Sequence, residues 1–525
     1  MRKMKKTITI ISLLLLMLAG TSCDGWLDLS PEDGVTREDF WQSKEQVESA
    51  VIGIYCEMMN TECINRMFLW GELRADMVTD GTRPNASYTS IRSGEIATDN
   101  AVCKWGNFYS VIRNCNLVLQ YADQAVPLDA SYSQQEADLY KAEAKALRAL
   151  MYFYLVRSFG EVPLVLEASV SDDQNYHIAK SSQDSVFQQI VLDLTEAEAV
   201  MQSQKPSYNM EYPKGRMTLW AVKAILADVY LWTGEYDEAL KRCRAIKESE
   251  EFRMISVSRT ALPDVENVYY ADATAVDALF NSVWGTGNSD ESIFELNFDE
   301  TKTNGFYALL SSARNVLVAN IDHIEANYFP LYELDEDVYD IRSNGFSYQG
   351  KIIWKYMAMT RLGTARTSTQ SYANWIFYRY PEVLLMMAEA LIQKGTQTDL
   401  QEAYSLIRQV RERANALESD DTDFSGIINA SELEQFLLDE RARELMFEGK
   451  RWYDVLRFAR RNNYARIDYL MDLALVSAPT GKQQSLQSKY GDYRSHYWPI
   501  HDDEIKSNDA LVQNTFYETT TTTNK

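Results

Sequence analysis

Histidine is scarce in this sequence, with four among 525 residues. None of the four lies in an H-E-x-x-H pattern or beside a cysteine cluster, so the signatures of zinc chemistry are missing. The P-loop, the G-x-S-x-G turn and a complete G-x-G-x-x-G fingerprint are missing as well. We therefore predict no catalytic residue, no metal, no cofactor and no enzymatic activity.

Basic residues are also scarce. The sequence has 52 Lys and Arg against 76 Asp and Glu, which gives a formal net charge of −24. Nucleic-acid binding depends on Lys and Arg that neutralise phosphates. The acidic balance therefore argues against nucleic acid as a partner. It argues equally against a direct contact between the protein body and an anionic lipid surface.

Long apolar runs are absent except for Ile8 to Ala19, which follows a basic start. This run is shorter than the roughly 20 residues of a membrane span, so residues 1–22 are predicted to be a secretory signal. Small residues precede Cys23, as in a bacterial lipobox. We predict cleavage before Cys23 and acylation of it, which would anchor a mature chain of net charge −28 that has no membrane span.

Cysteine is the next scarce residue, since five remain besides the acylated Cys23 and an odd number cannot all pair. Cys56 and Cys63 could form a disulfide only if a helix ends between them, because seven residues of one helix span about 10.5 Å. The sequence leaves this bridge open.

Helical periodicity is what the sequence has in abundance. Apolar residues recur at spacings of three and four in stretches that stop at Gly160, Gly234, Gly395 and Gly449. The turn after Gly234 resembles that of a tetratricopeptide (TPR) repeat. We predict a mainly α fold, a scaffold of helical hairpins at about 139–250 and 378–460, although unrelated hairpins with glycine caps would give the same pattern.

Two segments lack this periodicity. Residues 251–375 are rich in Gly, Asn, Asp and Tyr, and residues 292–298 alternate as a short strand does. Residues 78–107 carry several turn signals. We expect a loop-rich insertion at 251–375 within one domain of residues 23–525, because no linker divides the chain. Loops on a rigid scaffold are where ligand contacts usually lie.

Aromatic side chains in these loops are the best functional lead, because the flat faces of sugar rings stack on them. For any single ring, core packing is the commoner role. As a group, with one basic residue, they predict a shallow ligand site formed by Arg83, Tyr88, Trp105, Trp284, Phe306, Tyr307 and Trp354.

Two charged motifs have structural interpretations. Glu440, Arg443 and Glu444 are spaced i, i+3 and i+4, which favours an ion-paired helix face over an active site. The acidic residues 335–337 with Asp340 could supply oxygen ligands to Ca²⁺. A solvated acidic loop is the simpler interpretation, and we predict no metal there.

Several motifs together resemble the SusD/RagB family of Bacteroidetes over essentially the whole mature chain. They are Cys23 with residues 26–28, residues 378–390, residues 440–454, and residues 498–514. The resemblance implies one α-rich fold with four TPR-like units and a ligand-binding half of loops. It also implies a lipoprotein on the outer face of the outer membrane, which binds glycan as the lid of a SusC-like TonB-dependent transporter. His501 departs from the second proline that the family often has.

Three rival functions follow for the same chain. It could be a SusD-like subunit that binds peptides, a TPR adaptor that grips a protein partner, or, least favoured, a glycoside hydrolase. A hydrolase needs two carboxylates held across the sugar, and sequence alone cannot show such a pair.

Overall fold

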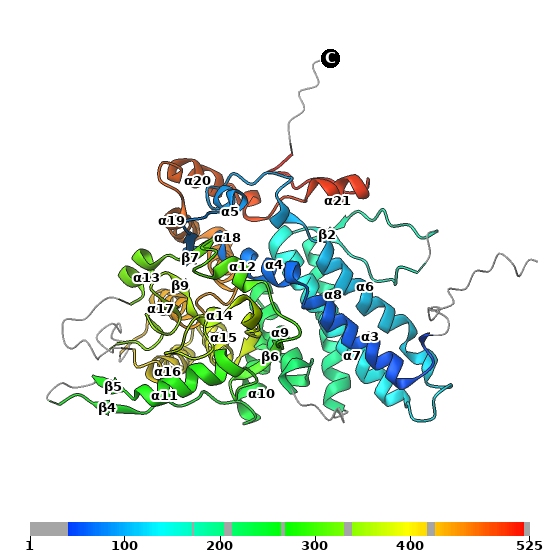
Figure 1. Cartoon of the computed structure of the whole chain (residues 1–525), viewed down its shortest axis with the longest axis horizontal. Coiled ribbons are helices and arrows are strands. Elements are labelled where there is room, and N and C mark those ends of the chain that lie inside the picture. Colours follow the sequence, from blue (N-terminus) through cyan, green and yellow to red (C-terminus); the bar gives the residue numbers. More distant parts are fainter. Residues whose placement is uncertain are drawn as a thin grey trace, which may run out of the picture.

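The computed structural model describes residues 40–170, 173–203, 213–263, 268–329, 339–416 and 426–518. The leader with Cys23 and the acidic stretch 335–337 lie outside these residues. Within them the fold is mainly helical, as predicted, with short strands between some of the helices (Figure 1).

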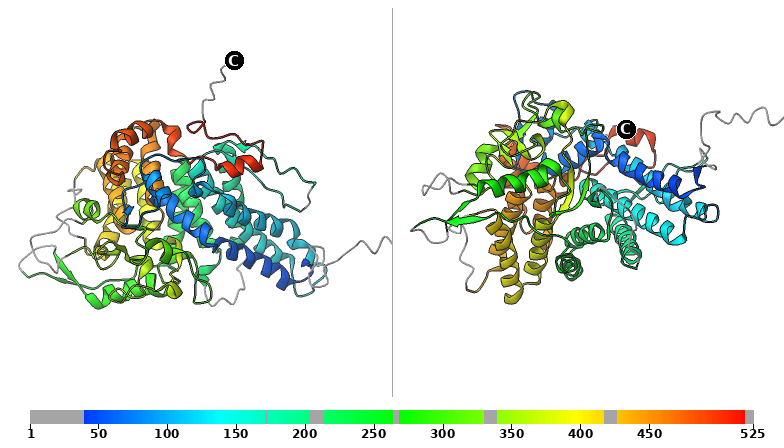
Figure 2. Two further views of the ribbon diagram at one scale, coloured as in Figure 1. Left: turned by 45° about the horizontal axis from the view of Figure 1, so that its top comes forward. Right: turned by 60° about the horizontal axis from the view of Figure 1, so that its bottom comes forward.

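Eight helices form the predicted scaffold, and successive ones pack side by side as paired columns (Figure 2). They are α7 (Gln134–Phe159), α8 (Gln183–Ser203), α9 (Leu219–Thr233), α10 (Tyr236–Glu248), α15 (Tyr380–Lys394), α16 (Gln397–Arg413), α17 (Ala430–Glu444) and α18 (Arg451–Tyr464). The second group joins the first where α10 packs against α15, although about 130 residues separate them in the chain.

Three of the four predicted glycines end their helices as expected. The amides of Gly160, Gly234 and Gly395 donate to the carbonyl four residues earlier, and all three have positive φ. Gly449 differs, because α17 already ends at Glu444 and the Gly449 amide donates instead to the Glu72 carboxylate at 2.9 Å. The fourth glycine therefore makes a long-range contact and is not a helix cap.

Further helices flank the scaffold that periodicity alone did not single out. Helices α3 and α6 pack on each other and on α7, which extends the layer of helices toward the N-terminus. The flanking helices are α3 (Lys44–Met58), α4 (Thr61–Glu72), α6 (Gly106–Tyr121), α19 (Ile467–Ser477), α20 (Gln483–Tyr490) and α21 (Asp502–Ser507).

The segments predicted as loops contain more regular structure than expected. Short helices occur at α5 (Ala86–Arg92), α11 (Ala273–Phe280), α12 (Phe306–Leu310), α13 (Ile321–Asn327) and α14 (Trp354–Met357). Most are too short for a periodic stripe to show in the sequence. The strands of the described residues all occur in two-stranded pairs.

The predicted strand at 292–298 is confirmed as β6 (Ser292–Leu296), which pairs antiparallel with β10 (Trp375–Arg379). All five residues of β6 are buried, so its polar side chains do not face solvent as simple alternation would suggest. The other pairs are β1 (Val78–Asp80) with β7 (Leu317–Ala319), β2 (Val162–Pro163) with β3 (Lys180–Ser181), β4 (Arg259–Ala261) with β5 (Tyr269–Ala271), and β8 (Tyr348–Gln349) with β9 (Ile352–Ile353).

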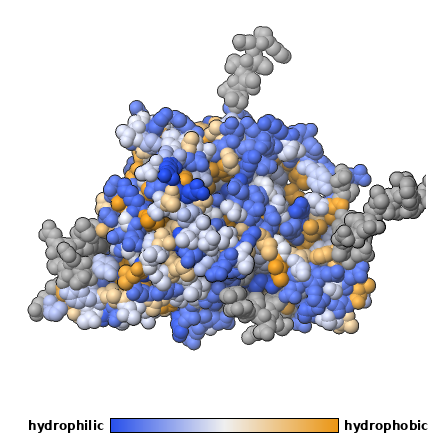
Figure 3. Space-filling model, viewed as in Figure 1, coloured by the Kyte–Doolittle hydropathy of each residue, from blue (hydrophilic) through white to orange (hydrophobic). Residues whose placement is uncertain are grey.

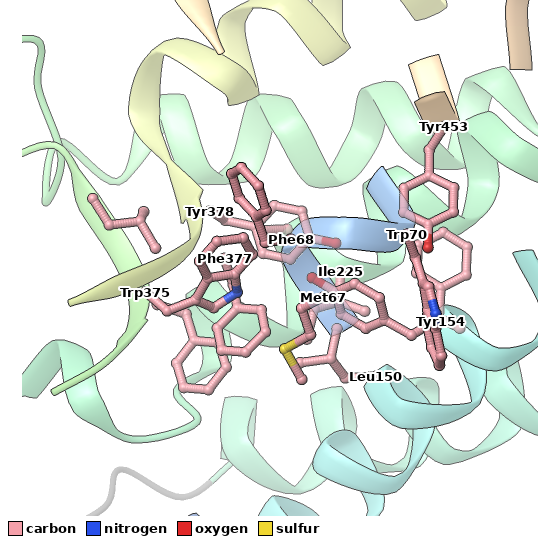
Figure 4. Packing of buried hydrophobic residues seen from close by; sticks show 14 of the residues in the cluster. Met67, Phe68, Trp70, Leu150, Tyr154, Ile225, Trp375, Phe377, Tyr378 and Tyr453 are labelled. Carbon is pink, nitrogen blue, oxygen red and sulfur yellow. The ribbon is translucent and has the colours of Figure 1, made fainter. Parts of the chain in front are cut away.

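One hydrophobic core runs through the scaffold and the loop-rich part. Figure 4 shows Met67, Phe68 and Trp70 of α4 among side chains of α7, α9 and β10. The ring of Phe377 on β10 stacks on Phe294 of β6, with centroids 4.8 Å apart. Helix α4 thus joins the two parts from the inside.

The charged motif of α17 is buried. Glu440 and Glu444 are at most 3% exposed and receive arginines from distant segments, among them Arg342 and Arg379. The expected pair between Arg443 and Glu440 is present at 3.3 Å. The structural interpretation therefore stands, but most partners come from other elements and not from the same helix face.

The C-terminal motif fastens residues 495–514 to the rest of the fold. The guanidinium of Arg74 lies between the rings of Trp452 and Trp498, 4.2 and 4.5 Å from their centroids. It also donates to the carbonyl oxygens of Ser495 and His496. These motif residues thus have a packing role in the fold.

The five cysteines of the described chain are free, including Cys56 and Cys63, although α3 ends and α4 begins between those two. Of the described helices, none combines the length and the apolar character that a membrane span requires. The face drawn in Figure 3 is mostly hydrophilic, with apolar residues scattered over it.

Candidate ligand-binding surface

The structure brings together the two segments that the sequence assigned to a ligand site. Strand β1 pairs with β7, which places Val78 opposite Ala319 and Asp80 opposite Leu317. The contact continues beyond the strands, because the amide of Gly81 donates to the Val316 carbonyl at 2.9 Å. Residues 78–83 and 313–319 therefore form one continuous edge.

Arg83 lies at the end of this edge and is exposed. Its backbone amide donates to the carbonyl of Asn315, and one guanidinium nitrogen donates to the Ala313 carbonyl at 3.1 Å. The remaining guanidinium donors face no described ion-pair partner, so Arg83 keeps hydrogen-bonding capacity toward solvent. A β-carbon on Gly81 would lie 2.1 Å from the Asn315 oxygen, so only glycine permits this close approach.

Side-chain contacts of Asp80 hold helix α5 against the same edge. Asp80 pairs with Arg92 at 2.7 Å and accepts a hydrogen bond from Thr89 at 2.8 Å. Tyr88, on the same helix, is half-buried. Burial, and then the charge of Glu62, raise the pKa of its phenol, so the hydroxyl stays protonated and can donate a hydrogen bond.

Helix α12, which carries Tyr307, begins close to α4. Gly305, just before α12, is in close contact with Thr61 and Asn65 of the first turns of α4. The Tyr307 amide donates to the Ser371 hydroxyl at 3.1 Å, which fixes the start of the helix. Tyr307 itself is half-buried, so part of its ring remains accessible.

Tyr88 and Tyr307 lie on helices near α4, and Arg83 lies on the edge that leads into α5, so we group these three residues as the α4 surface. It offers a guanidinium and two phenols. These groups suit a ligand with many hydroxyls, since they supply donors, an acceptor and ring faces. They include no pair of carboxylates for acid–base chemistry.

Four of the predicted contact residues do not belong to this surface, and the prediction is corrected for them. Trp105, Trp284, Phe306 and Trp354 are 3%, 4%, 0% and 3% exposed. Phe306 packs against Tyr356 with centroids 4.4 Å apart, and the Trp354 indole donates to the Arg361 carbonyl. Turn signals near these rings predicted that they are exposed. They are buried because the loop-rich part has few long helices, and large aromatic side chains fill its core instead.

One contributor was missed by sequence reasoning. Asn315 has φ +50° and its side-chain oxygen accepts from the Thr82 amide, so it shapes the edge beside Arg83. Asparagine at a turn is a recognisable signal.

Comparisons with known proteins agree with this architecture. The model of the SusD family matches residues 325–517, and a second model, described as starch-binding and associating with the outer membrane, matches residues 25–231. A SusD-like protein of Formosa agariphila is 26% identical over 481 residues, which cover 86% of this chain and 91% of that protein. A SusD-like protein of Bacteroides ovatus is 31% identical over 237 residues, 43% of this chain and 39% of that protein.

Solved structures show the same fold. A SusD superfamily protein from Bacteroides vulgatus superimposes with a TM-score of 0.69 at 21% identity, over 91% of this chain and all of that one. A SusD-like protein from Bacteroides fragilis also gives 0.69, at 18% identity, over 93% and 99%.

The chain belongs to the SusD/RagB family. Members of this family are non-catalytic binding proteins associated with the outer membrane, so this protein is not an enzyme. The family membership, and not the lack of a visible active site, supports that conclusion.

Proposed function

We propose that this protein captures oligosaccharide or polysaccharide at the cell surface and delivers it to a TonB-dependent transporter. The observation that supports the proposal is the pairing of β1 with β7, because it brings the exposed Arg83 to the segment that follows α12, the helix of the half-buried Tyr307. Starch binding in the description of the matching family model supports carbohydrate as the ligand class.

The anchor and the transporter complete the proposal. Acylated Cys23 would confine the protein to the outer membrane, on its extracellular face, without a spanning helix. Confinement in the plane of a β-barrel transporter raises the effective concentration of the two proteins, so even a modest interface would hold them together. A hinged lid is the simplest mechanism, since glycan bound by both halves would favour the closed state.

The α4 surface is tested by calorimetry with maltoheptaose, cellohexaose, xylohexaose and mannohexaose. Tyr307→Ala removes a stacking face and should weaken binding about 5- to 150-fold, by analogy with stacking of bases on aromatic rings. Arg83→Ala should also weaken it. Arg253→Ala is the control, because Arg253 is also an exposed arginine and lies on another segment. Unchanged affinity in both site variants, with folding intact, would exclude this placement.

The partner is tested by gentle detergent extraction of cells that carry a C-terminal tag, followed by mass spectrometry. We expect a large TonB-dependent barrel in comparable amount with the tagged protein. Cys23→Ala should leave the outer-membrane fraction after a salt wash. Recovery of this chain alone would favour the free-standing adaptor, and binding of peptides in place of glycans would favour the peptide-binding alternative.

A further inference from the structure

Two hollows border the start of α8, away from the residues of the α4 surface. The first, of about 500 Å³, lies between α8, the end of α9 and Arg460. The second, of about 330 Å³, lies between the end of α7, Tyr464 and residues 493–497. Gln183 lines both, so the hollows adjoin, and we call them together the α8 trough. Their sizes are within the range of small-molecule sites.

The second hollow has an aromatic wall. Tyr464 and Tyr493 are stacked, with centroids 3.8 Å apart and planes inclined by 10°. Tyr493 is 44% exposed, which is unusual for a large ring in this protein. A stacked pair with one ring so exposed offers a flat, rigid surface, which is what a sugar ring requires.

The backbone that holds this wall is strained. Asn462, Asn463 and Tyr464 have φ of +50°, +58° and +62°, so three successive residues that are not glycine are left-handed. Asparagine tolerates this conformation, but tyrosine rarely adopts it. The turn interrupts α18 and brings Tyr464 beneath Tyr493. Such strain is concentrated at ligand sites more than elsewhere.

Amide and hydroxyl groups lie at the junction of the hollows. The Tyr497 hydroxyl donates to the Gln183 side-chain oxygen at 3.0 Å, which fixes the amide of Gln183. Gly160 lies directly beneath, since a β-carbon there would be 3.3 Å from the Tyr497 ring and 3.4 Å from the Gln183 nitrogen. The glycine therefore keeps the floor of the trough open.

The charges that line the trough balance. Lys180, Arg494 and Arg460 supply three positive charges, and Glu161, Asp184 and Glu235 supply three negative charges. A site for a polyanion or a polycation would have a clear excess of the opposite sign. An uncharged ligand with many hydroxyls fits the balance best.

We propose that the α8 trough is a second carbohydrate site, in which an uncharged oligosaccharide stacks on Tyr493 and bonds to the polar groups around Gln183. The inference rests on the proposed function for its ligand class, but it uses none of the residues of the α4 surface. Two sites on one protein would let a long glycan bind at two points, which raises its apparent affinity.

The test is calorimetry with the same four oligosaccharides on the full exported chain. Tyr493→Ala should weaken binding of at least one of them about 5- to 150-fold in a background that already carries Arg83→Ala and Tyr307→Ala. Tyr121→Ala in that background is the matched control, because Tyr121 is also a tyrosine stacked on another ring, at the far end of the helices. Circular dichroism checks folding of each variant.

The outcomes separate the two sites. Residual binding that Tyr493→Ala removes and Tyr121→Ala spares supports the trough. No residual binding in the double-variant background overturns the trough and leaves the α4 surface in place. If Tyr493→Ala alone abolishes all binding, the trough is supported and the α4 placement fails. If the unaltered protein binds none of the probes, the trough is overturned, and the proposed function is decided by the co-purification of the transporter.

Discussion

The helical scaffold and the loop-rich part are stabilised in different ways. In the scaffold, apolar stripes pack against each other, and helix ends are closed by backbone hydrogen bonds of Gly160, Gly234 and Gly395. In the loop-rich part, single side chains hold several backbone segments at once. The buried Arg366, for example, donates to the carbonyl oxygens of residues 284, 285, 358 and 370. The scaffold is held by many similar contacts and should tolerate the loss of any one of them. The loop-rich part depends on single side chains such as Arg366, which no neighbour can replace.

The largest effect should come from the buried ion network that joins the two parts. Glu444 of α17 accepts from Arg342, Arg379 and Arg413, so Glu444→Gln leaves buried arginines without their counter-charge. We expect a loss of about 3–5 kcal/mol in the free energy of unfolding. Urea denaturation measures it, and Glu432→Gln, an exposed glutamate on the same helix, should stay within about 0.5 kcal/mol.

This network also predicts acid sensitivity. The arginines around Glu444 hold the pKa of its carboxyl well below the usual range. A carboxyl with a depressed folded pKa stabilises the fold above its unfolded pKa, and the contribution is lost as the pH falls. The loss of stability on acidification should therefore be smaller in Glu444→Gln than in the unaltered protein. An equal acid response in both would show that the network contributes little.

A smaller effect should come from the contact between α4 and the turn at Gly449. A β-carbon on Gly71 would lie 1.9 Å from the Gly449 carbonyl oxygen, so Gly71→Ala forces the two backbones apart. We expect a loss of about 1–3 kcal/mol or more. Gly53→Ala is the control, because Gly53 is in the helix α3 with open space around it, and alanine there should add about 0.5–1 kcal/mol. Thermal unfolding of both variants compares them directly.

The smallest effect concerns the carboxyl that receives the Gly449 amide. Burial is the main cause that raises the pKa of Glu72 to about 8. A carboxyl with a raised folded pKa stabilises the fold below its unfolded pKa, near 4.5, and this contribution is lost as the pH rises toward 8. Between pH 6 and 7 the unaltered protein should lose about 1 kcal/mol relative to Glu72→Gln. Parallel stability curves for the two proteins would contradict the assignment.

Much of the scaffold could be predicted from sequence because its signals are local. The stripe that ends at Gly234 depends on a few neighbouring residues, and it is confirmed. The role of Gly449 could not be predicted in this way. Its partner Glu72 lies 377 residues earlier, and no local pattern reports such a contact.

The candidate site shows the same limit. Turn signals correctly indicated which segments come together, as β1 and β7 do, but not which side chains face outward. Trp354 and Tyr307 look alike in sequence, yet one is buried and the other is half-exposed. The difference depends on neighbours such as Tyr356 and Ser371 that pack from other elements.

The contacts of residues 495–514 with the rest of the fold affect the stage at which folding can finish. Asn514 donates to the carbonyl oxygens of Phe159 and Trp498, and Arg74 is enclosed only when residues 495 and 496 are in place. Contacts across more than 300 residues form only when both partners are available. The end of α7 therefore lacks these contacts until residues 495–514 are available, so we expect this end of the fold to close last.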